Sequence, residues 1–79
     1  MGGKRKTPAE REIIFKGALI EQTLEEINNT LKKEGLPSVL KGYYSMVCKS
    51  YVPIFKKNSK LLDKYIQHPP PINKLPKGG

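Results

Sequence analysis

The chain is poor in several residue types, and each shortage excludes a class of protein. Its 79 residues include a single cysteine, Cys48, so an internal disulfide is excluded and nothing points to an oxidising compartment. No apolar run reaches the roughly 18 residues that a membrane span needs, and no signal-peptide pattern opens the chain. We therefore expect one small, soluble, intracellular domain, without a membrane partner, whose core lacks a covalent staple.

Catalytic and metal-binding patterns are also missing. Cys48 and His68 are the only residues of their kinds and lie far apart, so one chain cannot assemble a zinc site from them. There is no glycine-rich phosphate loop and no nucleophile elbow. Four of the seven acids form two pairs at expected helix starts, where the helix dipole explains them. The sequence predicts a binding protein that is not an enzyme, with no cofactor, metal or small-molecule substrate.

Acidic residues are scarce in the second half of the chain. Residues 1–34 carry seven basic and six acidic side chains, a net charge of +1. Residues 35–79 carry eight lysines and one acid, Asp63, a net charge of +7. A surplus of this size on so small a domain favours an anionic partner, either nucleic acid or an acidic membrane surface. The alternative explanation is a surface that only keeps the protein soluble.

Three regions are expected along the chain. Residues 1–6 form a basic arm that has nothing to bury and is expected to be disordered. Residues 7–67 are predicted to be a helical domain. Residues 68–79 contain a run of prolines and are predicted to be an extended tail without a core. In the arm, the cations Lys4, Arg5 and Lys6 are suited to contact phosphates, although a merely solvated terminus is equally compatible.

The first half of the helical domain carries two helix-start signals. Thr7 with Glu10 makes a capping box, and Pro8 stands at the first helical position. Thr23 with Glu26 makes a second capping box, which favours a second helix. However, apolar residues from Ile13 to Leu31 also keep heptad-like spacing, so a single helix from Pro8 to about Glu34 that pairs as a coiled coil stays open. In both versions Gly35 ends the helix.

The stretch from Leu36 to Tyr51 is predicted to be the helix that the chain presents to a partner. At helical spacing one side is apolar, and it is formed by Leu36, Leu40, Tyr43, Val47 and Tyr51. The opposite side is small, polar or basic and contains no acid, and it is formed by Ser38, Gly42, Ser45 and Lys49, with Lys41 at its edge. Such a side can approach a polyanion closely, and an ordinary solvated helix face is the alternative.

After Tyr51 the sequence predicts a break. Pro53 disfavours helical geometry at the preceding residue and can begin a new helix. A last apolar stripe then runs at helical spacing, and its other side carries Lys56, Lys57, Lys60 and Lys64. These lysines are suited to follow phosphates, or are simply solvated. Asn58 and Ser59 allow a shorter final helix that begins at about Lys60.

The segment TLEEINNTLKKEG, residues 23–35, resembles the helix-turn-helix core of DNA-binding regulators. It is most similar to the long-turn form of arginine-repressor-like domains, in which a capped helix leads through a K-x-E-G turn into a recognition helix. No alternating strand pattern follows, so the wing of that family is not expected. In its short, basic, all-helical style the chain is also similar to small DNA-binding proteins of archaeal plasmids and viruses. The resemblance covers about 25 residues.

These patterns together predict an all-α bundle of three to four helices with a helix-turn-helix-like core. The function predicted first is a DNA-binding transcriptional or copy-number regulator that acts on double-stranded DNA as a homodimer, with the helix at 37–51 reading the bases. The alternative is a protein-interaction or inhibitor module that uses the apolar stripe from Ile13 to Leu31. A third reading is nonspecific association with RNA or a membrane surface. The residues predicted to contact DNA are Lys4, Arg5, Lys6, Ser38, Lys41, Gly42, Ser45, Lys49, Lys56, Lys57 and Lys60.

Overall fold

A computed structural model of the protein describes residues 6–70 and residue 75. Every regular element in these residues is helical, and none is a strand. The elements are α1 (Pro8–Leu19), α2 (Leu24–Lys33), α3 (Lys41–Met46), η1 (Val47–Tyr51), α4 (Val52–Lys57) and α5 (Lys60–Gln67). Because α3, η1 and α4 follow one another without a break, the described residues form four helices in space, and the predicted all-α fold is confirmed.

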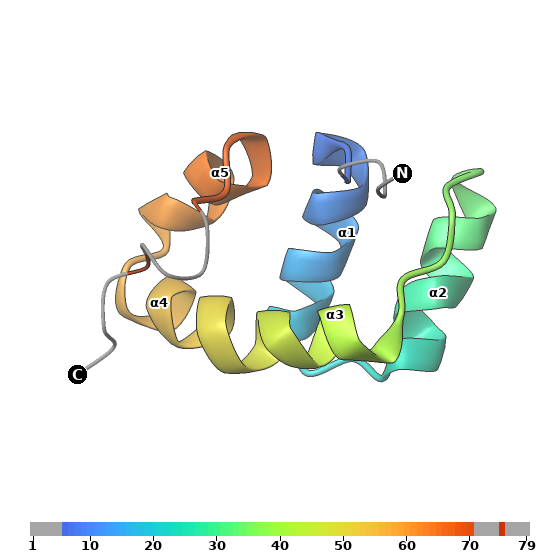
Figure 1. Cartoon of the computed structure of the whole chain (residues 1–79), viewed down its shortest axis with the longest axis horizontal. Coiled ribbons are helices and arrows are strands. Elements are labelled where there is room, and N and C mark those ends of the chain that lie inside the picture. The colour runs from blue at the N-terminus through green and yellow to red at the C-terminus, as the bar shows by residue number, and fades with distance from the viewer. Residues whose placement is uncertain (1–5, 71–74, 76–79) are drawn as a thin grey trace.

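Helix α1 is the centre of the arrangement (Figure 1). It packs against α2 on one side, against α5 on the other, and against η1 and α4. Residues 41–57, which we call the long helix, cross the C-terminal end of α1 and lie along one edge of the molecule. The inner side of the long helix therefore meets the core, and its outer side faces away from all other helices.

The starts of α1 and α2 are formed as the capping residues predict. The Thr7 hydroxyl accepts a hydrogen bond from the Glu10 backbone N–H, and the Glu10 carboxylate accepts one from the Thr7 N–H at 3.0 Å. Thr23 and Glu26 make the same reciprocal pair, with 2.8 Å for the Thr23 N–H bond. Since α2 has its own cap, the two-helix prediction is confirmed and a single helix over residues 8–34 is wrong.

The end of α2 is a Schellman motif built on glycine. Gly35 adopts a φ of 73°, its N–H donates to the Lys32 carbonyl at 3.0 Å, and the Leu36 N–H donates to the Leu31 carbonyl at 2.8 Å. These two bonds satisfy carbonyls that the helix end leaves without partners. The prediction that Gly35 ends the helix is confirmed.

The end of α1 has the same hydrogen bonds but no glycine. Glu21 adopts a φ of 61°, its N–H donates to the Ala18 carbonyl at 3.1 Å, and the Gln22 N–H donates to the Gly17 carbonyl at 2.9 Å. A left-handed conformation is sterically costly for a residue with a side chain. The turn between α1 and α2 is therefore strained at Glu21.

The third helix begins later than the sequence predicts. It starts at Lys41, not at Pro37, because Leu40 is still extended, with φ of −81° and ψ of 152°. In an extended segment neighbouring side chains point to opposite sides, so Val39 enters the core and Leu40 faces solvent with 78% of its surface exposed. The predicted core position of Leu40 is wrong, and Ser38 lies before the helix instead of on it.

Pro53 does not break the long helix, contrary to the prediction. Residues Val47–Tyr51 form a π-helical turn, in which the Val52 N–H donates to the Val47 carbonyl five residues earlier. A proline inside a regular α-helix lacks an N–H and clashes with the carbonyl four residues before it, here that of Lys49. The wider π-turn moves the backbone out of that position. The helix therefore continues to Lys57.

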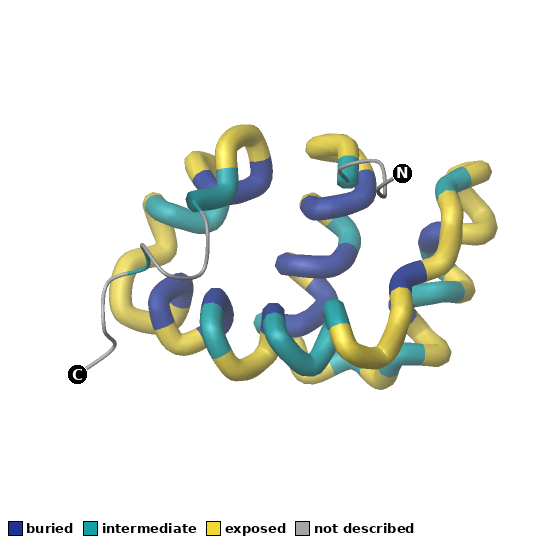
Figure 2. The backbone as a smooth tube through the Cα atoms, in the orientation of Figure 1, coloured by how far each residue is buried: buried dark blue, intermediate teal, exposed yellow. Residues whose placement is uncertain are grey.

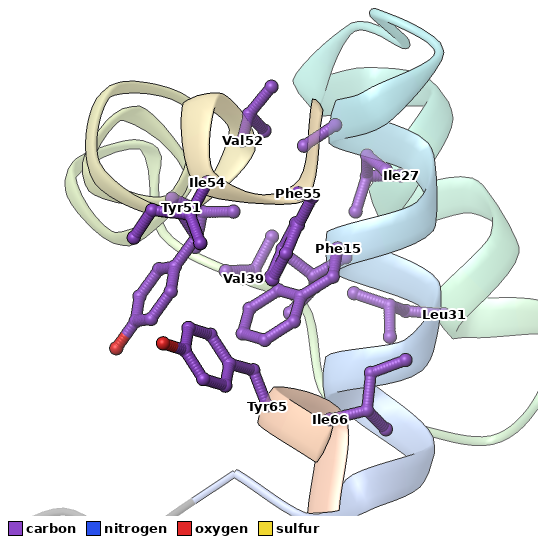
Figure 3. Close-up of a cluster of buried hydrophobic side chains, with 13 residues drawn as sticks. Phe15, Ile27, Leu31, Val39, Tyr51, Val52, Ile54, Phe55, Tyr65 and Ile66 are labelled. Carbon is purple, nitrogen blue, oxygen red and sulfur yellow. The ribbon is translucent and has the colours of Figure 1, made fainter. Parts of the chain in front are cut away.

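The core is centred on four aromatic rings (Figure 3). Phe15 of α1 is fully buried, and its ring centroid lies 5.2 Å from that of Tyr51 and 5.5 Å from that of Phe55. Tyr65 of α5 meets Tyr51 and Phe55 edge-on, at 5.9 and 5.7 Å. Aromatic pairs in these geometries add stabilisation beyond the area that they bury. The rings hold α1, the π-turn, α4 and α5 together.

Arg11 connects the beginning of α1 to the end of α5. Its buried guanidinium donates to the Ile66 carbonyl at 2.5 Å, to the Gln67 carbonyl at 3.0 Å and to the Lys6 carbonyl. A cation at a helix C-terminus is favourable because the helix dipole is negative there. The bonds hold the two ends of the helical domain together.

The predicted tail contributes packing at its described residues. The Tyr51 hydroxyl donates to the Pro70 carbonyl at 2.9 Å. Pro69 and Pro70 are half-buried, and Leu75 packs against the core. The expectation that the tail has no core is therefore wrong at these positions, because the proline segment returns to the aromatic cluster.

The strain at Glu21 predicts that glycine there stabilises the protein. Glu21→Gly is expected to raise the free energy of unfolding by about 0.5–1 kcal/mol, because relief of the left-handed strain exceeds the added freedom of the unfolded chain. Gly35→Ala, at the equivalent position of α2, is expected to lower it by a similar amount. Thermal melting followed by circular dichroism measures both, and a lower melting temperature for Glu21→Gly would contradict the strain.

Leu31 and Leu40 provide a matched pair for testing the core. Leu31→Ala is expected to cost about 2–5 kcal/mol, because the side chain is fully buried and its loss leaves a cavity. Leu40→Ala is expected to change stability by less than about 0.5 kcal/mol, because that side chain is in solvent. Urea unfolding curves compare the two, and equal costs would show that residues 36–40 are placed differently.

Candidate nucleic-acid interface

The outer side of the long helix is basic. Residues 41–57 contain Lys41, Lys49, Lys56 and Lys57 and no acid, and all four lysines are exposed. Figure 2 shows exposed and half-buried turns alternating along this side, with the buried positions turned towards α1. We call these four lysines the basic edge. At 1.5 Å per residue the helix that carries it is about 25 Å long.

The π-turn decides which lysines share the outer side. In an uninterrupted α-helix Val52 would lie about 20° around the axis from Lys41, and Lys57 about 160° away. The π-turn contains one extra residue, which rotates all later residues back by about 100° around the helix axis. Measured from Lys41, Val52 then lies about 80° away on the side of the core, and Lys57 lies about 60° away on the other side. The burial agrees, because Val52 is buried and Lys57 is exposed.

The other predicted DNA-contacting residues lie around the basic edge in different settings. Gly42 is exposed in the first turn of α3, and Ser45, one turn further on, is half-buried. Lys60 is exposed at the first position of α5, beyond the bend at Asn58 that ends the long helix. Ser38 is exposed in the extended segment before the helix. The structure brings the helical residues together, whereas Lys60 lies on another helix.

Of the predicted basic arm, the structure describes Lys6. The Lys6 ammonium lies over the Tyr43 ring, 5.0 Å from its centroid, which is a cation–π distance. Tyr43 belongs to the first turns of the long helix. The Lys6 side chain therefore reaches the long helix, whereas the chain itself enters α1 at the end away from the long helix (Figure 1). Lys4 and Arg5 lie outside the described residues.

The segment that leads into the long helix is held by an asparagine that the sequence analysis did not single out. The Asn28 side chain accepts a hydrogen bond from the Val39 N–H at 2.7 Å and donates to the Val39 carbonyl at 3.3 Å. These two bonds attach residue 39 to α2 in the way that a neighbouring β-strand would. The start of the long helix is thus fixed relative to the helix before it.

A second polar contact holds the first turns of the long helix. The Tyr44 hydroxyl donates to the Gln22 carbonyl in the turn between α1 and α2. Burial, with Cys48 nearby, raises the pKa of Tyr44 to about 12, so the hydroxyl keeps the proton that it donates at neutral pH. Asn28 and Tyr44 are polar side chains beside apolar stripes, and their spacing alone does not reveal these distant partners.

The Asn28 contact predicts a stability effect that its neighbour lacks. Asn28→Ala is expected to lower the free energy of unfolding by about 1–3 kcal/mol, because the Val39 N–H and carbonyl lose their partners. Asn29→Ala, at the adjacent exposed position, is expected to have an effect within about 0.5 kcal/mol. Chemical unfolding measures both variants. Equal free energies of unfolding for the two variants would show that Asn28 does not hold the segment at Val39 to α2.

Other kinds of site find little support in the described part of the chain. There, no three histidine, cysteine, aspartate or glutamate residues gather in a way that could hold a metal ion. Among the same residues no helix has the length and apolar character needed to span a membrane. The chain matches no model of a known protein family, no curated protein and no solved structure. Geometry and charge are therefore the basis for a functional proposal.

Proposed function

We propose that the chain is a DNA-binding regulator that places the outer side of its long helix in the major groove of double-stranded DNA. The observation that carries the proposal is the basic edge, which has four exposed lysines and no acid on one outward-facing helix. A helix with its side chains is about 10–12 Å wide, and the major groove is about 12 Å wide. The helix predicted for recognition at 37–51 is replaced in this proposal by residues 41–57.

Within the long helix, two parts have different proposed roles. Lys41 and Lys49, with Ser45 between them, stand on the N-terminal half and are proposed to meet base edges. Lys56 and Lys57, together with Lys60 on α5, are proposed to contact phosphates of the flanking backbone. A division of this kind is common, because backbone contacts set the position and base contacts set the sequence preference. Lys6, beside Tyr43, is proposed to contact a phosphate at the other end.

The alternative, a protein-interaction module, is less well supported because the apolar stripe that it would use is buried inside the chain. The apolar stripe was expected to run from Ile13 to Leu31 along one helix. In the structure the stripe is divided by the turn between α1 and α2, and Ile27 and Leu31 are fully buried within the chain itself. Neither side chain is free to form the seam of a coiled coil.

A homodimer on DNA remains part of the proposal. One helix of about 25 Å covers about seven base pairs at 3.4 Å each. Regulators with a single reading helix commonly gain specificity by binding two half-sites about one helical turn apart. Sedimentation of the protein with and without duplex DNA tests for two chains per site.

Binding to duplex DNA is expected to weaken steeply with salt. If about five phosphates are contacted, the plot of log K against log salt concentration should have a slope of about −4.5, because each contact releases condensed counterions. Fluorescence anisotropy with a labelled duplex measures the slope, and parallel titrations with duplex RNA and with anionic vesicles test the other anionic partners. Absence of duplex DNA binding at low salt would refute the proposal.

Variants that remove the same charge from different surfaces test whether DNA binding depends on the basic edge or only on net charge. The double variant Lys56→Ala/Lys57→Ala is expected to make the slope shallower by about 2, one unit for each lost phosphate contact. Lys32→Ala/Lys33→Ala removes the same charge from the C-terminal end of α2, which lies at the far end of the molecule from the long helix (Figure 1). That control is expected to keep the original slope. Equal effects would mean that no particular surface binds DNA.

A further inference from the structure

Leu40 is exposed at a position where a polar residue would serve the fold better. It is the N-cap residue of α3 and makes no side-chain capping bond, whereas α1 and α2 both begin with complete capping boxes. Serine, threonine, aspartate or asparagine is preferred there, and leucine sacrifices helix stability. With 78% of its surface exposed, it is one of two large hydrophobic side chains in solvent among the described residues.

The backbone around Leu40 is held rigidly. The preceding residue, Val39, is 3% exposed and has both its N–H and its carbonyl bonded to Asn28. The Leu40 carbonyl accepts from the Tyr44 N–H at 3.1 Å, and the Tyr44 side chain is itself bonded to the turn at Gln22. Leu40 is thus presented outwards from a fixed place at the N-terminal end of the basic edge.

The surroundings of Leu40 indicate what kind of partner it meets. Residues 35–62 contain no acid, and Lys41 follows Leu40 directly at the start of the basic edge. An anionic partner with apolar groups fits such a surface. The major groove of DNA presents one apolar group, the 5-methyl group of thymine, and reading helices contact base edges with their N-terminal residues.

A second copy of this chain fits the same surface poorly. A two-fold contact through Leu40 would bring each Lys41 close to its own copy, and like charges would then repel across the interface. The other exposed hydrophobic side chain, Ile20, is 71% exposed but is followed by Glu21 and then by the acids of α2. The two side chains therefore differ in electrostatic setting, and Ile20 serves as a matched control.

We propose that Leu40 packs against a thymine 5-methyl group at the edge of the bound site and so makes the protein prefer thymine there. This inference rests on the proposed DNA binding and adds a specificity residue to it. Leucine at this position costs stability but provides an apolar contact next to Lys41, which is proposed to meet base edges. A polar N-cap would improve the helix and lose the contact.

The test begins with selection of preferred sites from random duplex DNA by the wild-type protein. Each thymine of the selected site is then replaced singly by deoxyuridine, which lacks only the 5-methyl group. Replacement at one position is expected to weaken wild-type binding about fourfold, the equivalent of one buried methyl-sized group. Leu40→Ser is expected to bind the thymine and deoxyuridine duplexes equally, and Ile20→Ser is expected to keep the wild-type difference.

Stability measurements complete the test. Leu40→Ser is expected to raise the melting temperature by several degrees, since serine caps the helix, so loss of discrimination cannot be ascribed to unfolding. Salt-dependent binding with no deoxyuridine-sensitive position overturns the role of Leu40 and leaves DNA binding intact. Failure to bind any duplex refutes the proposed function itself. Equal weakening on both duplexes, together with conversion of a dimer to a monomer, would show that Leu40 is a subunit contact.

Discussion

The packing of Phe15 against Tyr51 and Phe55 is the interaction on which the rest of the structure depends. The two partners stand on opposite sides of the junction between the π-turn and α4, so one buried ring on α1 contacts the long helix both within and after its irregular turn. Tyr65 then closes the cluster from α5. Because all four rings are required to meet at one place, the rotation of the π-turn and α4 about the axis of the long helix has little freedom.

This constraint links the core of the protein to its basic edge. The long helix carries apolar side chains inwards and lysines outwards, so a rotation that buries Val52 also brings Lys57 to the side of Lys41. The π-turn allows both, and Pro53, whose ring a regular helix would exclude, is accommodated in the same turn. Core packing and the arrangement of the lysines are therefore two results of one helix register.

Polar side chains join the parts of the chain that the aromatic core does not reach. Arg11 binds the carbonyls at the end of α5, Asn28 binds residue 39, and Tyr44 binds the turn after α1. Each satisfies backbone groups that a loop or helix end leaves without regular partners. Gly17 allows α1 and α2 to approach, since a Cβ atom there would lie 2.0 Å from the Ile27 side chain. A domain of this size has few such contacts, so each contributes a large share of its order.

The sequence by itself determined the features that depend on residues within one helical turn of one another. Thr7 and Thr23 set the starts of the first two helices and Gly35 sets the end of the second, because a cap binds backbone groups only three to five residues away. The absence of acids from residues 35–62 was likewise visible in the sequence, and so were the lysines proposed to bind DNA. Only the tertiary structure decided where the third helix begins, because the bonds that keep residue 39 extended come from Asn28 in another helix. It also decided that the helix continues through Pro53. The π-turn that makes this possible is held by aromatic contacts with Phe15 in another helix, and a search for regular α-helical spacing cannot detect such a turn.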